Sequence, residues 1–123
     1  MSDERGAEGR DWHVAAQALR AKLAEDGGVS AMTQGAMGLV LYAPGPTTAD
    51  EHDDVHLQDE LYLVTRGASR FDRGGEEREL KAGDALFVPA GMRHRFHWRS
   101  DDFESWIVFY GPIGGESGEG RGR

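Results

Sequence analysis

The feature that most constrains the fold is the alternation of short apolar segments with glycine-rich turns between residues 28 and 112. The 18 glycines among 123 residues are too many for a helical bundle, but they suit a chain of short strands and tight turns. The apolar segments repeat with the period of two that is typical of strands, and no helical period separates them. The sequence therefore predicts one all-β domain, a barrel or jelly roll, over residues 28–112.

The expected strands end where residues cannot continue a hydrogen-bonded ladder. Ala43-Pro44-Gly45-Pro46 begins a loop that runs to about Asp53, and Gly74-Gly75 is typical of a hairpin turn. The predicted strands cover residues 29–34, 36–42, 61–66, 69–72, 77–81, 85–88, 93–98 and 104–110.

The residues before the barrel predict one amphipathic helix. Its apolar positions have helical spacing and are Trp12, Ala16, Leu19 and Leu23. We expect this helix at residues 12–25, within an N-terminal segment 11–27 that ends at Gly27. Trp12 is then expected to anchor the helix against the barrel. The two ends of the chain, residues 1–10 and 113–123, are polar and glycine-rich and are expected to be disordered.

Composition disfavours several classes of partner. The net charge of −8 and the pI near 5.0 argue against binding to nucleic acid. No apolar run is long enough to span a bilayer, so we expect no membrane partner and interpret the chain as cytoplasmic. Because the chain has no cysteine, a bound metal ion would need His, Asp or Glu as ligands.

Histidines and a carboxylate occupy positions that suit a metal site. On an unbroken strand His56 and Glu60 would lie about 13 Å apart, so they can share an ion only if the chain bends at Leu57-Gln58-Asp59. The polar Gln-Asp pair is suitable turn material. His94 follows the rigid Pro89-Ala90-Gly91 turn, at the start of another strand. Three ligands from neighbouring strand ends would form an open-sided metal site.

Two motifs give the chain its resemblance to a known family. The first runs from Gly45 to Gly67 and contains His56 and Glu60, with one extra residue after Gly45. The second is Gly83, Pro89, Gly91 and His94 at the spacing of the family motif. Over about residues 36–110 the chain resembles a small single-domain cupin. The resemblance implies a double-stranded β-helix barrel in which His56, Glu60 and His94 bind one divalent metal ion.

The chain departs from the family motifs at two positions. Asp54 stands where the first motif has its first histidine, and Trp98 stands where the second motif has asparagine. Asp54 could act as an oxygen ligand, or a bulge in the loop could bring in His52 instead. Either ligand set suits Fe(II), Mn(II), Ni(II) or Zn(II). The alternative is a barrel that has kept the fold and lost the metal.

Aromatic residues are expected to line a pocket around the ion. Tyr62, Phe96 and Trp98 share strand parity with the ligand positions, and His52 lies in the adjacent loop. Trp98 would narrow this pocket. Trp106 has the same parity, although ordinary filling of the barrel explains it better. His97 is expected to face away from the site.

The resemblance also implies a partner and a class of function. A homodimer is expected, and Leu63, Ile107 and Phe109 are predicted to supply outward apolar surface. The leading interpretation is a metal-binding cupin that acts on a small organic molecule, as an oxygenase- or isomerase-type enzyme. The alternative is a non-catalytic module that binds or senses a small molecule, with or without metal.

Overall fold

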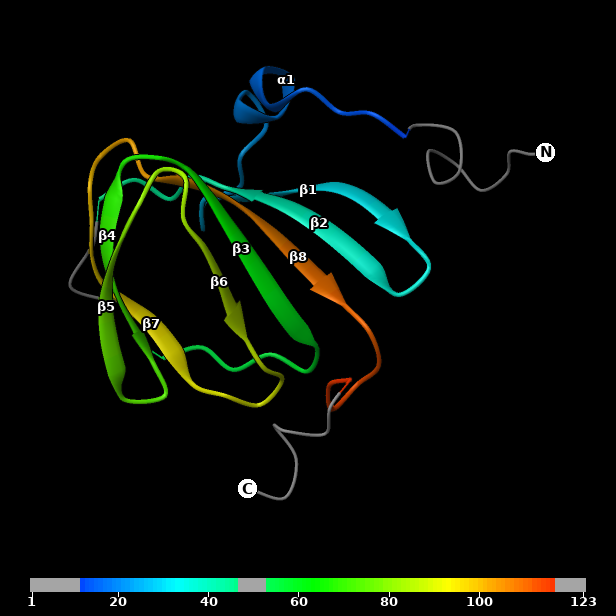
Figure 1. The fold of residues 1–123 in the computed structure, drawn as a ribbon. Helices are drawn as coiled ribbons and strands as arrows, with labels where there is room; N and C mark the ends of the chain where they lie inside the picture. The colour runs from blue at the N-terminus through cyan, green and yellow to red at the C-terminus, as the bar shows by residue number, and fades with distance from the viewer. Residues whose placement is uncertain (1–11, 47–52, 117–123) are drawn as a thin grey trace.

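The computed structural model describes residues 12–46 and 53–116, and within them eight strands form two antiparallel sheets. The sheets pack as two layers of a barrel (Figure 1), with strand orders β1-β2-β8-β3-β6 and β5-β4-β7. The strands are β1 Gly28–Gln34, β2 Met37–Tyr42, β3 Asp59–Arg66, β4 Ala68–Arg73, β5 Glu76–Lys81, β6 Ala85–Val88, β7 His94–Arg99 and β8 Glu104–Tyr110. Each predicted strand is present with ends within two residues, so the all-β prediction is confirmed.

The core lies between the two sheets and is built from alternate residues of their strands. Side chains that alternate along β3 point into it, so Tyr62 and Val64 are each 3% exposed. Phe71 of β4 and Phe96 of β7 approach from the facing sheet, with ring centroids 4.9 Å apart. Phe103, just before β8, closes the core at 1% exposure. Close packing of these aromatic rings fixes the distance between the sheets.

The N-terminal helix is shorter than the sequence predicts. Helix α1 covers Ala16–Arg20, five residues instead of the expected 12–25. The N-cap residue Ala15 has no side chain that can accept a capping hydrogen bond, and so short a helix gains little from its own propensity. The chain after α1 forms turns, and Gly27 has a positive φ of 89°. A Cβ at Gly27 would lie 2.3 Å from Pro44 Cα, so this close approach requires glycine.

Two further expectations for the ends of the chain need correction. Trp12 is 84% exposed, so the prediction that it anchors the helix is wrong. Within the segment 113–116, Gly114 N donates to Leu57 O and Glu116 N donates to Asp59 Oδ2, so this part of the expected disordered tail is held against the barrel. The remaining expectations of disorder, for residues 1–10 and 117–123, lie outside the described residues. No helix in the described part of the chain is long and apolar enough to cross a membrane.

An ion pair holds α1 beside β2 and β8 (Figure 1). Arg20 Nε donates to Glu104 Oε1 at 2.7 Å, and its Nη2 donates to Glu104 Oε2 at 3.1 Å. Thr65 Oγ1 donates a further hydrogen bond to the Glu104 carboxylate. The hydrogen bond from Arg20 is the largest cause that lowers the pKa of Glu104, and burial opposes it. Bidentate pairs of this geometry are the strong class of salt bridge.

We predict that Arg20→Met lowers the midpoint of urea denaturation at neutral pH. The control is Arg78→Met, because Arg78 makes a comparable pair with Glu76 in which both partners are exposed, and its loss should change little. Since the folded pKa of Glu104 is lowered, the pair stabilises the protein above the unfolded pKa and is lost as pH falls through the folded pKa. The difference between wild type and Arg20→Met should therefore shrink in acid. Equal midpoints for all three proteins at neutral pH would contradict this account.

Candidate metal centre

The chain bends sharply between His56 and Glu60, as the sequence predicts. Gln58 fixes the bend because its Nε2 donates to Ala36 O at 2.8 Å and to Gly111 O at 2.9 Å. Asp59 opens β3 and is 3% exposed, and its Oδ1 accepts a hydrogen bond from Ala90 N. The bend is therefore tied to the β1–β2 turn, to the end of β8 and to the turn before β7. It brings His56 Nδ1 to 2.7 Å from Glu60 Oε2.

His94 is the first residue of β7, and its ring orientation is fixed by the backbone. Asp54 N donates to His94 O, and His94 N donates to Asp54 O. His94 Nδ1 lies 3.0 Å from Met92 O. Because a carbonyl oxygen can only accept, the proton of the neutral ring must be on Nδ1, which leaves the lone pair of Nε2 available to a ligand. A backbone carbonyl on the far nitrogen is a common partner of metal-binding histidine.

His56, Glu60 and His94 form a compact group of donor atoms. One donor atom from each lies within 4.8 Å of the others, and His94 Nε2 is 3.6 Å from Glu60 Oε2. Glu60 is 1% exposed and His94 is 3% exposed. Glu60 Oε1 and His94 Nε2 are buried and have no hydrogen-bond partner. Buried polar atoms normally have partners, and two imidazoles with one carboxylate are a donor set that binds divalent ions, so these residues fit a metal ion.

The carboxylate of Glu60 changes the acidity of its neighbours. Its hydrogen bond raises the pKa of His56 above the ordinary value, partial burial opposes that shift, and the charge of Asp54 adds a smaller increase. Burial is the largest cause that raises the pKa of Tyr62 well above its ordinary value, and the charge of Glu60 raises it further. Tyr62 therefore presents a neutral hydroxyl at neutral pH.

The two candidates for a fourth ligand have different outcomes. Asp54 lines the same cavity as the three residues, but its carboxylate does not belong to their compact group. The backbone of Asp54 is bridged to that of His94 at this edge of the cavity. His52 lies outside the described residues.

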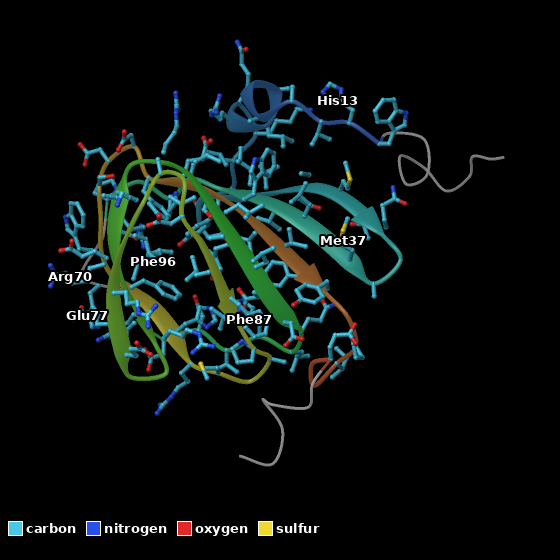
Figure 2. All side chains as sticks on the ribbon, viewed as in Figure 1. His13, Met37, Arg70, Glu77, Phe87 and Phe96 are labelled. Atoms are coloured by element: carbon cyan, nitrogen blue, oxygen red, sulfur yellow. The ribbon has the colours of Figure 1, made fainter. Side chains whose placement is uncertain are left out.

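A cavity of about 520 Å³ opens beside the three residues. Tyr62 and Phe96 line it, as expected, and Phe96 points into the space between the sheets (Figure 2). The described residues that line the cavity are Glu25, Asp26, Gly28, Val40, Tyr42, Pro44, Asp54, His56, Glu60, Tyr62, His94, Phe96, Arg99, Ile107 and Phe109.

A β-bulge in β7 overturns the prediction that Trp98 lines the cavity. Phe96 pairs with Phe71 and Trp98 pairs with Arg70, so two consecutive residues of β4 oppose three of β7. The extra residue, His97, reverses the alternation. His97 faces outward, as expected, and lies 3.3 Å from Asp72. Trp98 also faces outward and is 50% exposed, so it does not narrow the cavity.

The same bulge places an unexpected residue in the cavity wall. Arg99 is 3% exposed, and its guanidinium carbon lies 5.5 Å from the centre of the Phe96 ring. Its Nε donates to Gly45 O at 2.9 Å, and its Nη2 donates to Pro46 O at 3.3 Å. Regular alternation from His94 assigns Arg99 to the outer face, so no pattern in the sequence could have identified it.

The predicted faces of β8 are also wrong. Ile107 is 6% exposed and lines the cavity with Phe109, although both were expected to face outward. Trp106 pairs with Leu41 and Leu63 on the opposite face of the sheet, although its parity was expected to match the ligand positions. A strand that is apolar on both faces does not reveal its inward face from its own residues.

We predict that Glu60→Gln lowers the pKa of His56 in the metal-free protein, because the amide cannot supply the negative charge that stabilises the imidazolium. Histidine ring resonances followed by NMR over a pH titration would measure this change. Since the folded pKa is raised, the charged pair stabilises the fold below the unfolded pKa, and this contribution is lost as pH rises through the folded pKa. An unchanged His56 pKa in Glu60→Gln would contradict the geometry.

Comparison with known proteins identifies the family. A family model described as a cupin domain matches residues 38–110. An uncharacterised protein of Streptomyces coelicolor is 37% identical over 76 residues, covering 62% of this chain and 71% of that protein. Protein SchB of Streptomyces halstedii is 32% identical over 82 residues, covering 66% of this chain and 57% of its own length. The protein named polyketide synthase CurC, of Streptomyces cyaneus, is 36% identical over 78 residues, covering 63% of this chain and 49% of its own length.

Solved structures show the same fold at lower identity. A cupin-2 domain protein of Shewanella frigidimarina has a TM-score of 0.60 and 14% identity, covering 77% of this chain and 91% of that chain. KdgF of Halomonas has a TM-score of 0.57 and 22% identity, covering 67% and 74%. The barrel, its two motifs and the family match together show that this chain belongs to the cupin family.

Proposed function

We propose that the protein binds one divalent metal ion through His56, Glu60 and His94, and that the ion holds an oxygen of a small organic molecule in the adjacent cavity. The observation that carries this proposal is the convergence of one donor atom from each of these three residues. Two of their buried polar atoms, Glu60 Oε1 and His94 Nε2, have no hydrogen-bond partner. An ion at this point would satisfy both atoms.

The donor set limits the metal and the chemistry. Two imidazoles and one carboxylate with open positions suit Fe(II), Mn(II), Ni(II) or Zn(II). Such an ion supplies a Lewis acid that polarises a substrate oxygen and, for Fe(II), a place for O2. The chain itself orients His94 through Met92 O, buries Glu60, and presents the neutral hydroxyl of Tyr62 to the cavity.

We propose that the activity is of the oxygenase or isomerase type. The expected obstruction by Trp98 would have favoured a purely binding role, and its outward position leaves a cavity of about 520 Å³ that can admit a substrate. The name of the CurC relative supports an oxygen-rich carbon skeleton as substrate, although this chain spans only 49% of that protein. Oxygen-rich carbon skeletons are chemically suited to coordinate a divalent ion.

A homodimer remains our proposal for the assembly, and the outer face of the five-stranded sheet supports it. Cross-strand pairing places two rows of apolar residues on this face. The first row is Met32, Leu39, Val108, Leu61 and Phe87. The second is Val29, Trp106, Leu63 and Ala85, with Leu41 between Val29 and Trp106 already buried in the single chain. The rows span five strands, roughly 20 Å, and an apolar sheet face of this width can pack against a second copy.

Metal binding should raise the melting temperature of the protein, because a ligand that binds the native state stabilises it. We expect metal-free protein to gain several degrees when one of the four candidate ions is added, and His94→Ala to lose this gain. His97→Ala is the matched control, because it removes an exposed histidine three residues away and should keep the gain. Elemental analysis of protein purified without a histidine tag should find about one ion per chain.

The same measurement, the gain in melting temperature when the ion is added, tests the role of Asp54. Because Asp54 lies outside the compact group, we expect Asp54→Ala to retain most of the metal affinity. A loss as large as that of His94→Ala would show that Asp54 becomes a fourth ligand. If no ion shifts the melting temperature of the wild type, the metal proposal is wrong, and the chain has kept the cupin fold but lost metal binding.

The dimer proposal predicts that Leu63→Asp gives a monomer, because it places a charge at the centre of the apolar face. Leu63 is 39% exposed in the single chain. Trp98→Asp is the control, since Trp98 is also an exposed apolar residue but lies on the other sheet. Light scattering coupled to gel filtration would measure the mass of each variant. A wild type that stays monomeric at high concentration, or equal masses for both variants, would refute this interface.

A further inference from the structure

The charged residues that line the cavity are mostly acidic. Four carboxylates line the cavity, those of Glu25, Asp26, Asp54 and Glu60. Arg99 is the only lysine or arginine among the lining residues that the structure describes. His56 and His94 would be neutral as metal ligands. The excess of negative charge in the cavity has the same sign as the net charge of −8 of the chain.

These charges form two groups, one beside each end of β7. Asp54 and Glu60 lie beside the candidate ligands, at the start of β7 and β3. The second group lies at the other end of β7, where Arg99 is the last residue of the strand and donates a hydrogen bond to Gly45 O. Glu25 and Asp26 belong to this far end because the adjacent Gly27 packs against Pro44.

Neither end carries an excess of positive charge. At the near end, the two charges of a divalent ion are balanced by Glu60 and Asp54. At the far end, the two negative charges of Glu25 and Asp26 outnumber the single positive charge of Arg99. An anionic group on a ligand would lose its hydration on entering the cavity and would find no uncompensated positive charge to replace it. An uncharged group has a much smaller desolvation cost. Aromatic walls, including the stacked Tyr42 and Phe96 rings 5.9 Å apart, suit uncharged groups.

We propose that the cavity selects ligands that carry no negative charge apart from their metal-binding oxygens. Glu25 and Asp26 disfavour an anionic group at the far end by electrostatic repulsion. The inference rests on the proposed function, because it needs the ion to hold the ligand. It deepens that function by giving the substrate class as uncharged molecules with metal-binding oxygens.

Two isosteric probes test the charge selection. 3,4-Dihydroxybenzamide and 3,4-dihydroxybenzoate share the same catechol oxygens and differ in an amide or a carboxylate. Each is titrated anaerobically into Co(II)-loaded protein, and the visible bands of cobalt report the dissociation constant. Each dissociation constant is divided by the dissociation constant of the same probe and free Co(II), which removes the intrinsic difference between the two catechols.

After this correction the benzoate should bind roughly five- to tenfold more weakly than the benzamide at low ionic strength, as expected for a charge near two carboxylates. The ratio should fall in about 0.5 M salt, where the screening length is only a few ångströms.

Two double variants of equal charge change identify the residues responsible. Glu25→Gln with Asp26→Asn should bring the ratio close to one, and the amide oxygen introduced by Asp26→Asn can still accept the hydrogen bond that Gly28 N donates to Asp26 Oδ1. Glu76→Gln with Glu77→Gln is the control, because the Glu76 and Glu77 positions at the start of β5 do not line the cavity. The control should keep the wild-type ratio.

The outcomes separate this inference from the function on which it rests. If no site-specific cobalt bands form, so that His94→Ala and wild type look alike, the proposed function is wrong and this inference falls with it. If cobalt binds but neither probe binds, or both bind equally after correction, the charge selection is wrong. If both double variants lower the ratio equally, overall charge acts and the assignment to Glu25 and Asp26 is overturned.

Discussion

The candidate site depends on the bend between His56 and Glu60. An extended chain would hold these residues about 13 Å apart, too far to share an ion. The side chains of Gln58 and Asp59 prevent extension by hydrogen bonding to the β1–β2 turn, the end of β8, the turn before β7 and the C-terminal segment. The bend is therefore a product of tertiary contacts, and its two ends meet with His56 Nδ1 2.7 Å from Glu60 Oε2.

The burial of Glu60 explains the chemistry of this region. A carboxylate at 1% exposure is costly unless positive charge or hydrogen bonds surround it. His56 meets part of this requirement, and its pKa is raised as a result. Glu60 Oε1 and His94 Nε2 are left without hydrogen-bond partners, and one divalent ion would bind both. The cost of a buried, incompletely paired carboxylate is thus the physical reason to expect a cation here.

Local sequence signals predicted most of the fold and the three central residues. Turn residues set the strand ends, and the motif spacing identified His56, Glu60 and His94 before their proximity was visible. Predictions that relied on uninterrupted alternation were wrong. The extra residue His97 turned Trp98 outward and Arg99 inward, and nothing in the local sequence marks that bulge. Because β8 is apolar on both faces, its sequence does not indicate which face points inward. Helix α1 is shorter than its apolar spacing suggests because its N-cap residue offers no capping side chain.

The most direct test of the metal site is a crystal structure of protein grown with the ion that stabilises it most, with diffraction recorded at the absorption edge of that metal. The account predicts one strong anomalous peak about 2.0–2.3 Å from donor atoms of His56, Glu60 and His94, with remaining positions open to the cavity. A peak at the surface beside His97 and Asp72, or a hydrogen-bonded water between Glu60 and His94 with no metal peak, would contradict it.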